Sequence, residues 1–217
     1  MKRKRAAPLL GYRGGVLGWP PRGSVGARDE DEALVRRAQG GDEAAFEELV
    51  RRHEGEVFRV CRRMLGSRED AMDAAQDTFV RVYRALPRFR GEAAFRTWVY
   101  GIALNVCRNV LASAPRRAAA RTLPVHGEAE NGKTPMILAD GRANPEAVAY
   151  GRELGQALER ALATLSPEHR EVLVLREVEG LEYEEMAAAL GCRLGTVKSR
   201  LARARAALLS RLDGVWP

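Results

Sequence analysis

The sharpest chemical signal in the sequence is a basic stretch near its C-terminus. Between Thr196 and Arg211 there are five basic residues and no acidic one, whereas Glu177 to Glu185 holds five acidic residues and no basic one. A helix that lies in a DNA groove has to keep carboxylates away from the phosphates, while a solvated helix ordinarily mixes both signs. The stretch therefore favours DNA binding, with a charged surface helix as the alternative.

The residues in front of this stretch supply the turn of a helix-turn-helix. A first helix ends in Ala-Leu-Gly, and a tight turn with Gly191 leads into Thr-Val-Lys-Ser-Arg-Leu. We expect apolar residues of the first helix, such as Met186, to meet Val197 and Leu201 on the second. Burying those positions leaves the following residues facing outwards: Lys198, Ser199, Arg200, Ala202 and Arg203.

A second signal is a segment in which aromatic residues alternate with arginines. Its members are Phe89, Arg90, Phe95, Arg96, Trp98 and Tyr100. Such a surface can stack unpaired bases while arginines hold the phosphate backbone. Aromatic residues at helical spacing are more often core residues, so the residues alone favour core packing.

Nothing in the sequence has the pattern of a catalytic or metal site. The histidines (His53, His126, His169) and cysteines (Cys61, Cys107, Cys192) are scattered, without metal-ligand spacing. No P-loop, GxSxG or GxGxxG motif occurs. Asp70, Asp73 and Asp77 share one helix face, which indicates a partner-binding face more simply than a metal site. We expect no enzyme activity, no cofactor and no metal.

The charge of the chain is unevenly distributed. The formal net charge is +7, and residues 1–28 hold seven basic residues and no acidic one, which accounts for all of it. This Gly- and Pro-rich tail lacks periodicity and is predicted to be disordered. No run of about 18 apolar residues is present, and no apolar h-region follows the basic start. We therefore predict a cytoplasmic protein without a membrane span.

Hydrophobic periodicity predicts an all-α fold in two helical domains joined by a flexible linker. Four helices with short connections form a bundle over residues 29–111. Asp42 and Ser67 are expected N-caps, Gly66 ends the second helix, and Pro87 stops the third. Residues 112–143 form the linker, and residues 144–217 form the helix-turn-helix domain.

These blocks together resemble the extracytoplasmic-function (ECF) sigma factors, the smallest class of bacterial promoter-specificity subunits. "GDEAAFEELVRRH", "EDAMDAAQDTFVRVYRAL" and "FRGEAAFRTWVYGIALNVCRN" resemble region 2 of that family. "LSPEHREVLVLREVEGLEYEEMAAALGCRLGTVKSRLARARAAL" resembles region 4. The C-terminal block alone is weak evidence, because many response regulators carry a similar "GTVKSRL" helix, whereas the front block discriminates.

The resemblance implies roles for particular residues. It implies that core RNA polymerase is bound at the β′ clamp helices by Asp70, Asp73, Gln76, Asp77 and Phe79, and also at the β flap. It assigns the promoter −10 element to Phe89, Arg90, Gly91, Arg96, Trp98 and Asn105. It assigns the −35 element to Thr196, Lys198, Ser199, Arg200 and Arg203. It further implies promoter DNA and an anti-sigma factor as partners.

The chain also departs from the family pattern. Glu182 stands where a capping Ser or Thr is frequent, so we expect the first helix of the helix-turn-helix to fray. The alanines of "DAMDAAQ" replace bulkier aliphatic residues and are expected to loosen that helix. The alternative function is a transcription regulator that binds duplex DNA by itself through the C-terminal motif.

Overall fold

The computed structural model describes residues 25–120, 155 and 157–212, and its elements are helical throughout these ranges. They are α1 (Val25–Gln39), α2 (Glu43–Leu65), α3 (Arg68–Ala85), the 3-10 turn η1 (Leu86–Arg88), α4 (Phe95–Ala120), α6 (Pro167–Leu173), the π-helical turn η2 (Val174–Val178), α7 (Tyr183–Leu190) and α8 (Leu194–Leu212). Residues 157–163 are also helical. The all-α prediction is confirmed. Within the described residues, no helix combines the length and apolarity needed to cross a membrane.

The helix boundaries follow from side-chain caps. Asp42 accepts a hydrogen bond from the backbone N–H of Ala45 at 3.1 Å, and Ser67 accepts one from Asp70 at 3.2 Å. Each cap satisfies one of the N–H groups that a helix start leaves without an intrahelical partner. Gly66 ends α2 with φ at 77°, a left-handed conformation that favours glycine. These signals are local, which is why the sequence predicted them.

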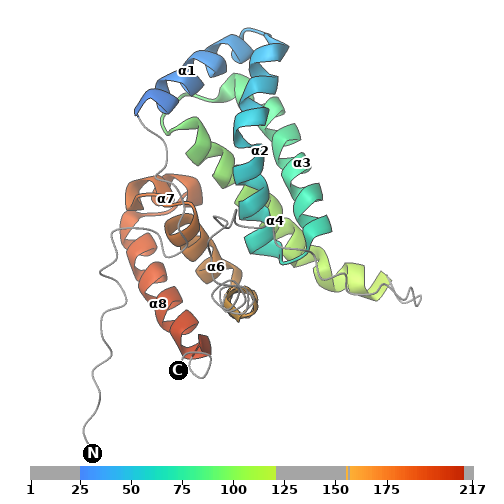
Figure 1. Cartoon of the computed structure of the whole chain (residues 1–217), viewed down its shortest axis with the longest axis vertical. Helices are drawn as coiled ribbons and strands as arrows, with labels where there is room; N and C mark the ends of the chain where they lie inside the picture. Colours follow the sequence, from blue (N-terminus) through green and yellow to red (C-terminus); the bar gives the residue numbers. More distant parts are fainter. Residues whose placement is uncertain (1–24, 121–154, 156, 213–217) are drawn as a thin grey trace, which may run out of the picture.

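Helices α1 to α4 pack into one bundle (Figure 1). Its centre is formed by side chains with little or no exposure from α2 and α4, namely Leu49, Val57, Val60, Met64, Val99, Leu104 and Val106. Cys61 and Cys107 are buried in the same core as free thiols. Residues 29–85 and the start of α4 thus form a compact frame for the loop between η1 and α4.

Helix α3 buries a face of mostly small side chains. The buried residues are Ala71, Ala74, Thr78 and Val82. Thr78 is fully buried, and its hydroxyl is satisfied by donating a hydrogen bond to the carbonyl of Ala74, 2.6 Å away. Small side chains let α3 approach α2 closely, so the alanines expected to loosen this helix are part of its packing. Phe79, which the resemblance assigned to the polymerase contact, is half-buried.

Two predicted boundaries differ from the observed helices. Helix α1 begins at Val25, inside the tail predicted to be disordered, and α4 continues to Ala120, well beyond the predicted linker start at 112. Residues 112–120 contain five alanines and two arginines, both strong helix formers, and the helix continues through them despite Pro115. Residues 1–24 and 121–154, which include the rest of the predicted tail and linker and the predicted start of the second domain at 144, lie outside the described residues.

The second domain contains the predicted helix-turn-helix. Gly191 ends α7 with φ at 60°, and Met186 of α7 is buried together with Val197 and Leu201 of α8. The expected fraying at Glu182 is wrong. The side chain of Glu185 accepts a hydrogen bond from the backbone N–H of Glu182 at 2.9 Å, so a carboxylate caps the start of α7 from within the helix.

The two domains lie side by side, with α7 against α4 and α6 beside α2 (Figure 1). The helices come close together at Gly101 of α4. A Cβ atom at this position would lie 2.8 Å from the backbone oxygen of Ala189 in α7, a distance that real Cβ atoms essentially never reach. The absence of a side chain at Gly101 therefore permits this contact.

Candidate nucleic-acid interface and partner groove

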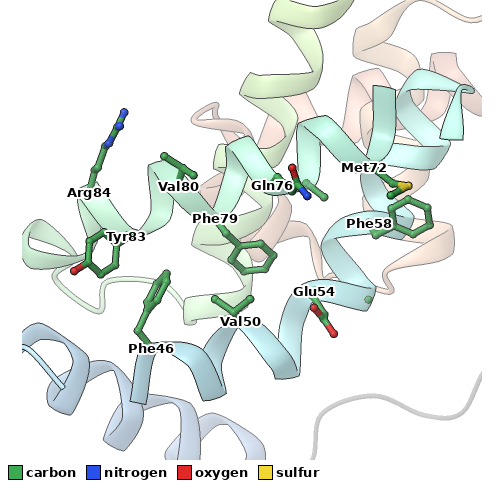
Figure 2. A pocket seen from close by; sticks show the side chains of 12 residues that line it. Phe46, Val50, Glu54, Phe58, Met72, Gln76, Phe79, Val80, Tyr83 and Arg84 are labelled. Carbon is green, nitrogen blue, oxygen red and sulfur yellow. The ribbon is translucent and has the colours of Figure 1, made fainter. Parts of the chain in front are cut away.

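An open apolar groove runs along α2 and α3 (Figure 2). Its volume is about 1040 Å³, and its lining includes Phe46, Val50, Phe58, Met72, Gln76, Phe79, Val80 and Tyr83. Phe46 and Tyr83 form its edge-to-face aromatic pair, with ring centroids 5.0 Å apart. Met72, Val80 and Tyr83 are 47%, 46% and 54% exposed, so this groove presents apolar surface to solvent.

The five predicted polymerase-contact residues of α3 fall into two groups, one that lines the groove and one that lies beside it. Gln76 and Phe79 line it, and Figure 2 shows both side chains on the groove side of the helix. The remaining three are aspartates outside the lining, of which Asp77 forms an ion pair with Arg81 at 2.9 Å. The carboxylates thus belong to a polar strip of α3 next to the groove.

Sequence reasoning missed the apolar part of this surface. Met72, Val80 and Tyr83 interrupt the polar face of α3 at spacings of eight and three residues, with Gln76 between them. These spacings place them on one side of a helix. An apolar row on an otherwise charged face was the signal that could have revealed it.

The loop between η1 and α4 carries a compact aromatic cluster. The Phe89 and Trp98 rings are tilted by 34° with centroids 4.6 Å apart, and Phe95 lies 6.0 Å from Phe89 and 5.9 Å from Trp98. Phe95 is 4% exposed, whereas Phe89 and Trp98 are half-buried. Phe95 therefore packs in the core, whereas Phe89 and Trp98 remain partly exposed beside it.

The other predicted −10 residues lie in different settings. Gly91 has φ at 73°, and the neighbouring Arg90 side chain is 85% exposed. Arg96 lies on the domain boundary, 3.8 Å from the carboxylate of Glu185. Asn105 is exposed near the middle of α4 and accepts a hydrogen bond from Arg108 at 2.5 Å.

The predicted −35 residues lie on or near the exposed face of α8. Lys198, Ser199 and Arg203 are exposed, and Arg203 donates to the backbone oxygen of Ser199 at 3.2 Å. Arg200 forms an ion pair with Glu168 at 3.4 Å, which occupies its guanidinium group. Thr196 is half-buried in the first turn of α8. The structure therefore leaves Lys198, Ser199 and Arg203 accessible together on one helix.

Buried polar groups connect α4 of the first domain to the second domain. Arg108 binds both carboxylate oxygens of the buried Glu171, at 2.5 and 3.0 Å. The Tyr100 hydroxyl lies 2.9 Å from Glu56 and 2.8 Å from Glu179, so its single proton is donated to one carboxylate at a time. Burial, and then the charges of Glu179 and Glu56, raise the pKa of Tyr100.

His53 of α2 also has an electrostatic role. Its Nε2 lies 2.9 Å from Asp31 and its Nδ1 3.6 Å from Glu56. Burial alone lowers the pKa of His53, but the hydrogen bonds and charges of the two carboxylates outweigh it and raise the pKa to about 9. His53 is thus a buried histidine held between two carboxylates, which favour its charged form. Among the described residues, no group of His, Cys, Asp and Glu is arranged to hold a metal ion.

Sequence comparisons identify the family. The profile described as Sigma-70 region 2 matches residues 49–117, and that described as Sigma-70, region 4 matches residues 155–208. The ECF RNA polymerase sigma-E factor of Escherichia coli (strain K12) is 40% identical over 183 residues, covering 84% of this chain and 94% of the relative. The chain belongs to the ECF RNA polymerase sigma factors. The RNA polymerase sigma-H factor of Pseudomonas aeruginosa is 36% identical over 181 residues, covering 83% of this sigma factor and 93% of that one.

Solved structures have the same architecture. The structure of CnrH in complex with the cytosolic domain of CnrY is 30% identical to this sigma factor, with a TM-score of 0.60, covering 86% of this chain and 99% of that chain. The sigma factor RpoE of Bartonella quintana, in complex with the anti-sigma factor NepR, matches with a TM-score of 0.56 and 22% identity, covering 77% of this chain and 96% of that chain. The latter likeness is one of fold.

Proposed function

We propose that this sigma factor binds core RNA polymerase through the groove between α2 and α3, and reads promoter DNA through the η1–α4 loop and α8. The observation that carries the first part is the exposed apolar lining, with Met72, Val80 and Tyr83 each about half exposed. A concave apolar surface with polar residues beside it suits an amphipathic helix. We infer that this occupant is the β′ clamp helices, with the aspartates of α3 meeting their polar flank.

The aromatic cluster supports a role at the −10 element. Phe89 and Trp98 are positioned so that an unpaired base can stack against an open ring, and the exposed Arg90 can bind a neighbouring phosphate. Removing a base from the duplex stack costs a few kcal/mol, which stacking on a protein ring offsets. We infer that the loop captures such a base, with Arg96 and Asn105 of α4 as further contacts.

The accessible face of α8 supports a role at the −35 element. Lys198, Ser199 and Arg203 project from one helix of a helix-turn-helix, the geometry that enters a major groove. We assign base contact to Arg203 and expect Thr196 and Arg200 to flank it. For Arg200 this requires exchange of its Glu168 partner for DNA.

We infer further partners from the same reading. The second domain is assigned a contact with the β flap of polymerase. An anti-sigma factor is a further proposed partner, as NepR is for the Bartonella protein. Acting on chromosomal DNA with polymerase, the chain is inferred to work in the cytoplasm and by binding alone, without a cofactor.

The test of the groove is a charge placed in it. Val80→Glu introduces a carboxylate on an exposed groove residue without touching the bundle core, and we expect at least a tenfold loss of affinity for core polymerase, because an unpaired charge resists burial. Ala112→Glu places the same charge on an exposed residue of α4 outside the groove and should leave affinity unchanged. Equal affinities of the two variants would refute the groove assignment.

Promoter-specific transcription should require this chain and core polymerase together. A stand-alone regulator, the alternative, would bind its duplex site specifically without polymerase. Gel-shift measurements on promoter DNA with and without core enzyme distinguish the two, and specific binding by the chain alone would overturn the sigma-factor mechanism proposed here.

A further inference from the structure

Helix α1 contacts the loop that precedes α4. Gln39, the last residue of α1, donates two hydrogen bonds from its side-chain amide, to the carbonyl of Leu86 at 2.9 Å and to that of Phe89 at 2.8 Å. Since both partners are carbonyl oxygens, the NH₂ group has to face them, and both of its hydrogens are used. The N–H of Phe89 also bonds to Leu86, at 3.0 Å. Gln39 therefore clamps both ends of the η1 turn.

A second contact connects α1 to the start of α4. The Nε2 atom of His53 lies 2.9 Å from a carboxylate oxygen of Asp31, and the centroid of the His53 ring lies 5.4 Å from that of Phe95. Phe95 is the first residue of α4 and is almost fully buried. Helix α1 thus acts at both sides of the loop: directly on Phe89, and through His53 on Phe95.

The loop itself has few means of fixing its position. Arg90 and Glu92 are 85% and 81% exposed and stand 4.0 Å apart, an ion pair that contributes little at such exposure. Gly91 between them has no side chain to pack. The place of the Phe89 ring over Trp98 therefore depends on what holds the Phe89 backbone, and Gln39 binds its carbonyl directly.

We propose that Gln39 is a positioning residue for −10 recognition: it holds the backbone of Phe89 so that this ring and Trp98 form a base-binding site of fixed shape. The inference rests on the proposed −10 function of the loop. It assigns a part in promoter selectivity to α1, which carries none of the predicted DNA contacts.

The test removes the two hydrogen bonds and keeps the bulk. Gln39→Met is neutral, similar in length and equally compatible with a helix. Ala33→Met is the control, because it places the same side chain on an exposed position of α1. Holoenzymes made with each variant transcribe from a panel of promoters that share one −35 element and differ by single bases in the −10 element.

We expect Gln39→Met to reduce the preference for the best −10 element over its single-base variants about three- to tenfold, the effect of losing hydrogen bonds of ordinary strength. Affinity for core polymerase and the preference among −35 variants should stay unchanged. An unaltered −10 preference, or an equal loss with Ala33→Met, would overturn the inference.

A second measurement follows the loop without DNA. With Trp19 and Trp216 replaced by Phe, Trp98 is the remaining tryptophan of the chain. Its emission should shift to longer wavelength in Gln39→Met and not in Ala33→Met, because release of Phe89 exposes the indole ring. If the emission of Trp98 did not shift in Gln39→Met, the positioning role would be refuted. This would hold even if the variant transcribed poorly, because a lower stability could cause poor transcription by itself. A wild-type holoenzyme that showed no −10 preference would instead contradict the proposed function, while the emission shift would still support the clamp.

Discussion

Gly101 offers a direct way to perturb the contact between the two domains. In Gly101→Ala, the new Cβ would lie 2.8 Å from the backbone oxygen of Ala189, and a backbone atom cannot turn aside as a flexible side chain can. Helix α7 has to move away from α4. Neither domain loses a side chain from its own core, so the perturbation is confined to the boundary between them.

The expected magnitude combines two opposing effects. Replacing a glycine in a helix interior by alanine stabilises the helix by about 1 kcal/mol. Forcing an extra carbon into a tightly packed contact costs about 1–3 kcal/mol. Gly55→Ala in α2 is the matched control, because its Cβ would meet only the end of the Arg59 side chain at 3.8 Å. We therefore expect Gly101→Ala to be less stable than Gly55→Ala by about 1–3 kcal/mol.

Small-angle scattering and urea unfolding measure the outcome. Gly55→Ala should keep the dimensions of the wild-type chain and unfold at higher urea. Gly101→Ala should have a larger radius of gyration and lose the gain in stability. If both variants scattered alike and gained the same stability, the close approach of α4 and α7 in solution would be refuted.

Three further predictions concern charge and base contact. The pKa of His53 is raised from 6.5 to about 9, so its charge stabilises the fold fully below pH 6.5 and this contribution is lost as the pH rises through about 9. His53→Gln should remove this pH dependence from the free energy of unfolding, a change of at most about 3 kcal/mol. A pH profile of stability that stays the same in the variant would contradict the ion pair. Arg203→Ala should relax the preference among −35 variants by about 1–3 kcal/mol. Arg193→Ala, directly before α8, should weaken binding to all −35 variants alike. If both substitutions weakened binding to every −35 variant equally, Arg203 would not be the base-reading residue. Deletion of residues 1–24, whose charged residues are all basic, should lower non-specific DNA affinity at low salt and leave the set of transcribed promoters unchanged, which run-off transcription on a promoter library checks.

The parts of this fold that the sequence predicted depend on interactions between near neighbours. The caps at Asp42 and Ser67 act over three residues, and the turn at Gly191 depends on a single backbone conformation. The buried contacts of Val197 and Leu201 follow from helical spacing. All of these are encoded within a few residues, so composition and periodicity are sufficient to find them.

The parts that the sequence did not predict depend on distant partners. The place of Phe79, in the core or in the groove, depends on how closely α3 approaches α2, which the small residues of α3 determine. The charge of His53 depends on Asp31, 22 residues away. The site residues themselves came from resemblance to a family, and the two that line the groove, Gln76 and Phe79, could be separated from their aspartate neighbours only by the packed helices.

The polar character of the domain boundary has a calorimetric consequence. Arg108, Glu171, Tyr100 and Glu179 would become hydrated if the domains parted, and exposure of polar surface lowers the heat capacity whereas apolar exposure raises it. Parting of the domains should therefore absorb heat with a smaller heat-capacity change per unit area than the unfolding of either domain. The enthalpy and entropy of parting should therefore change less with temperature than those of unfolding, so that the free energy of parting varies almost linearly between a cold cell and a warm one.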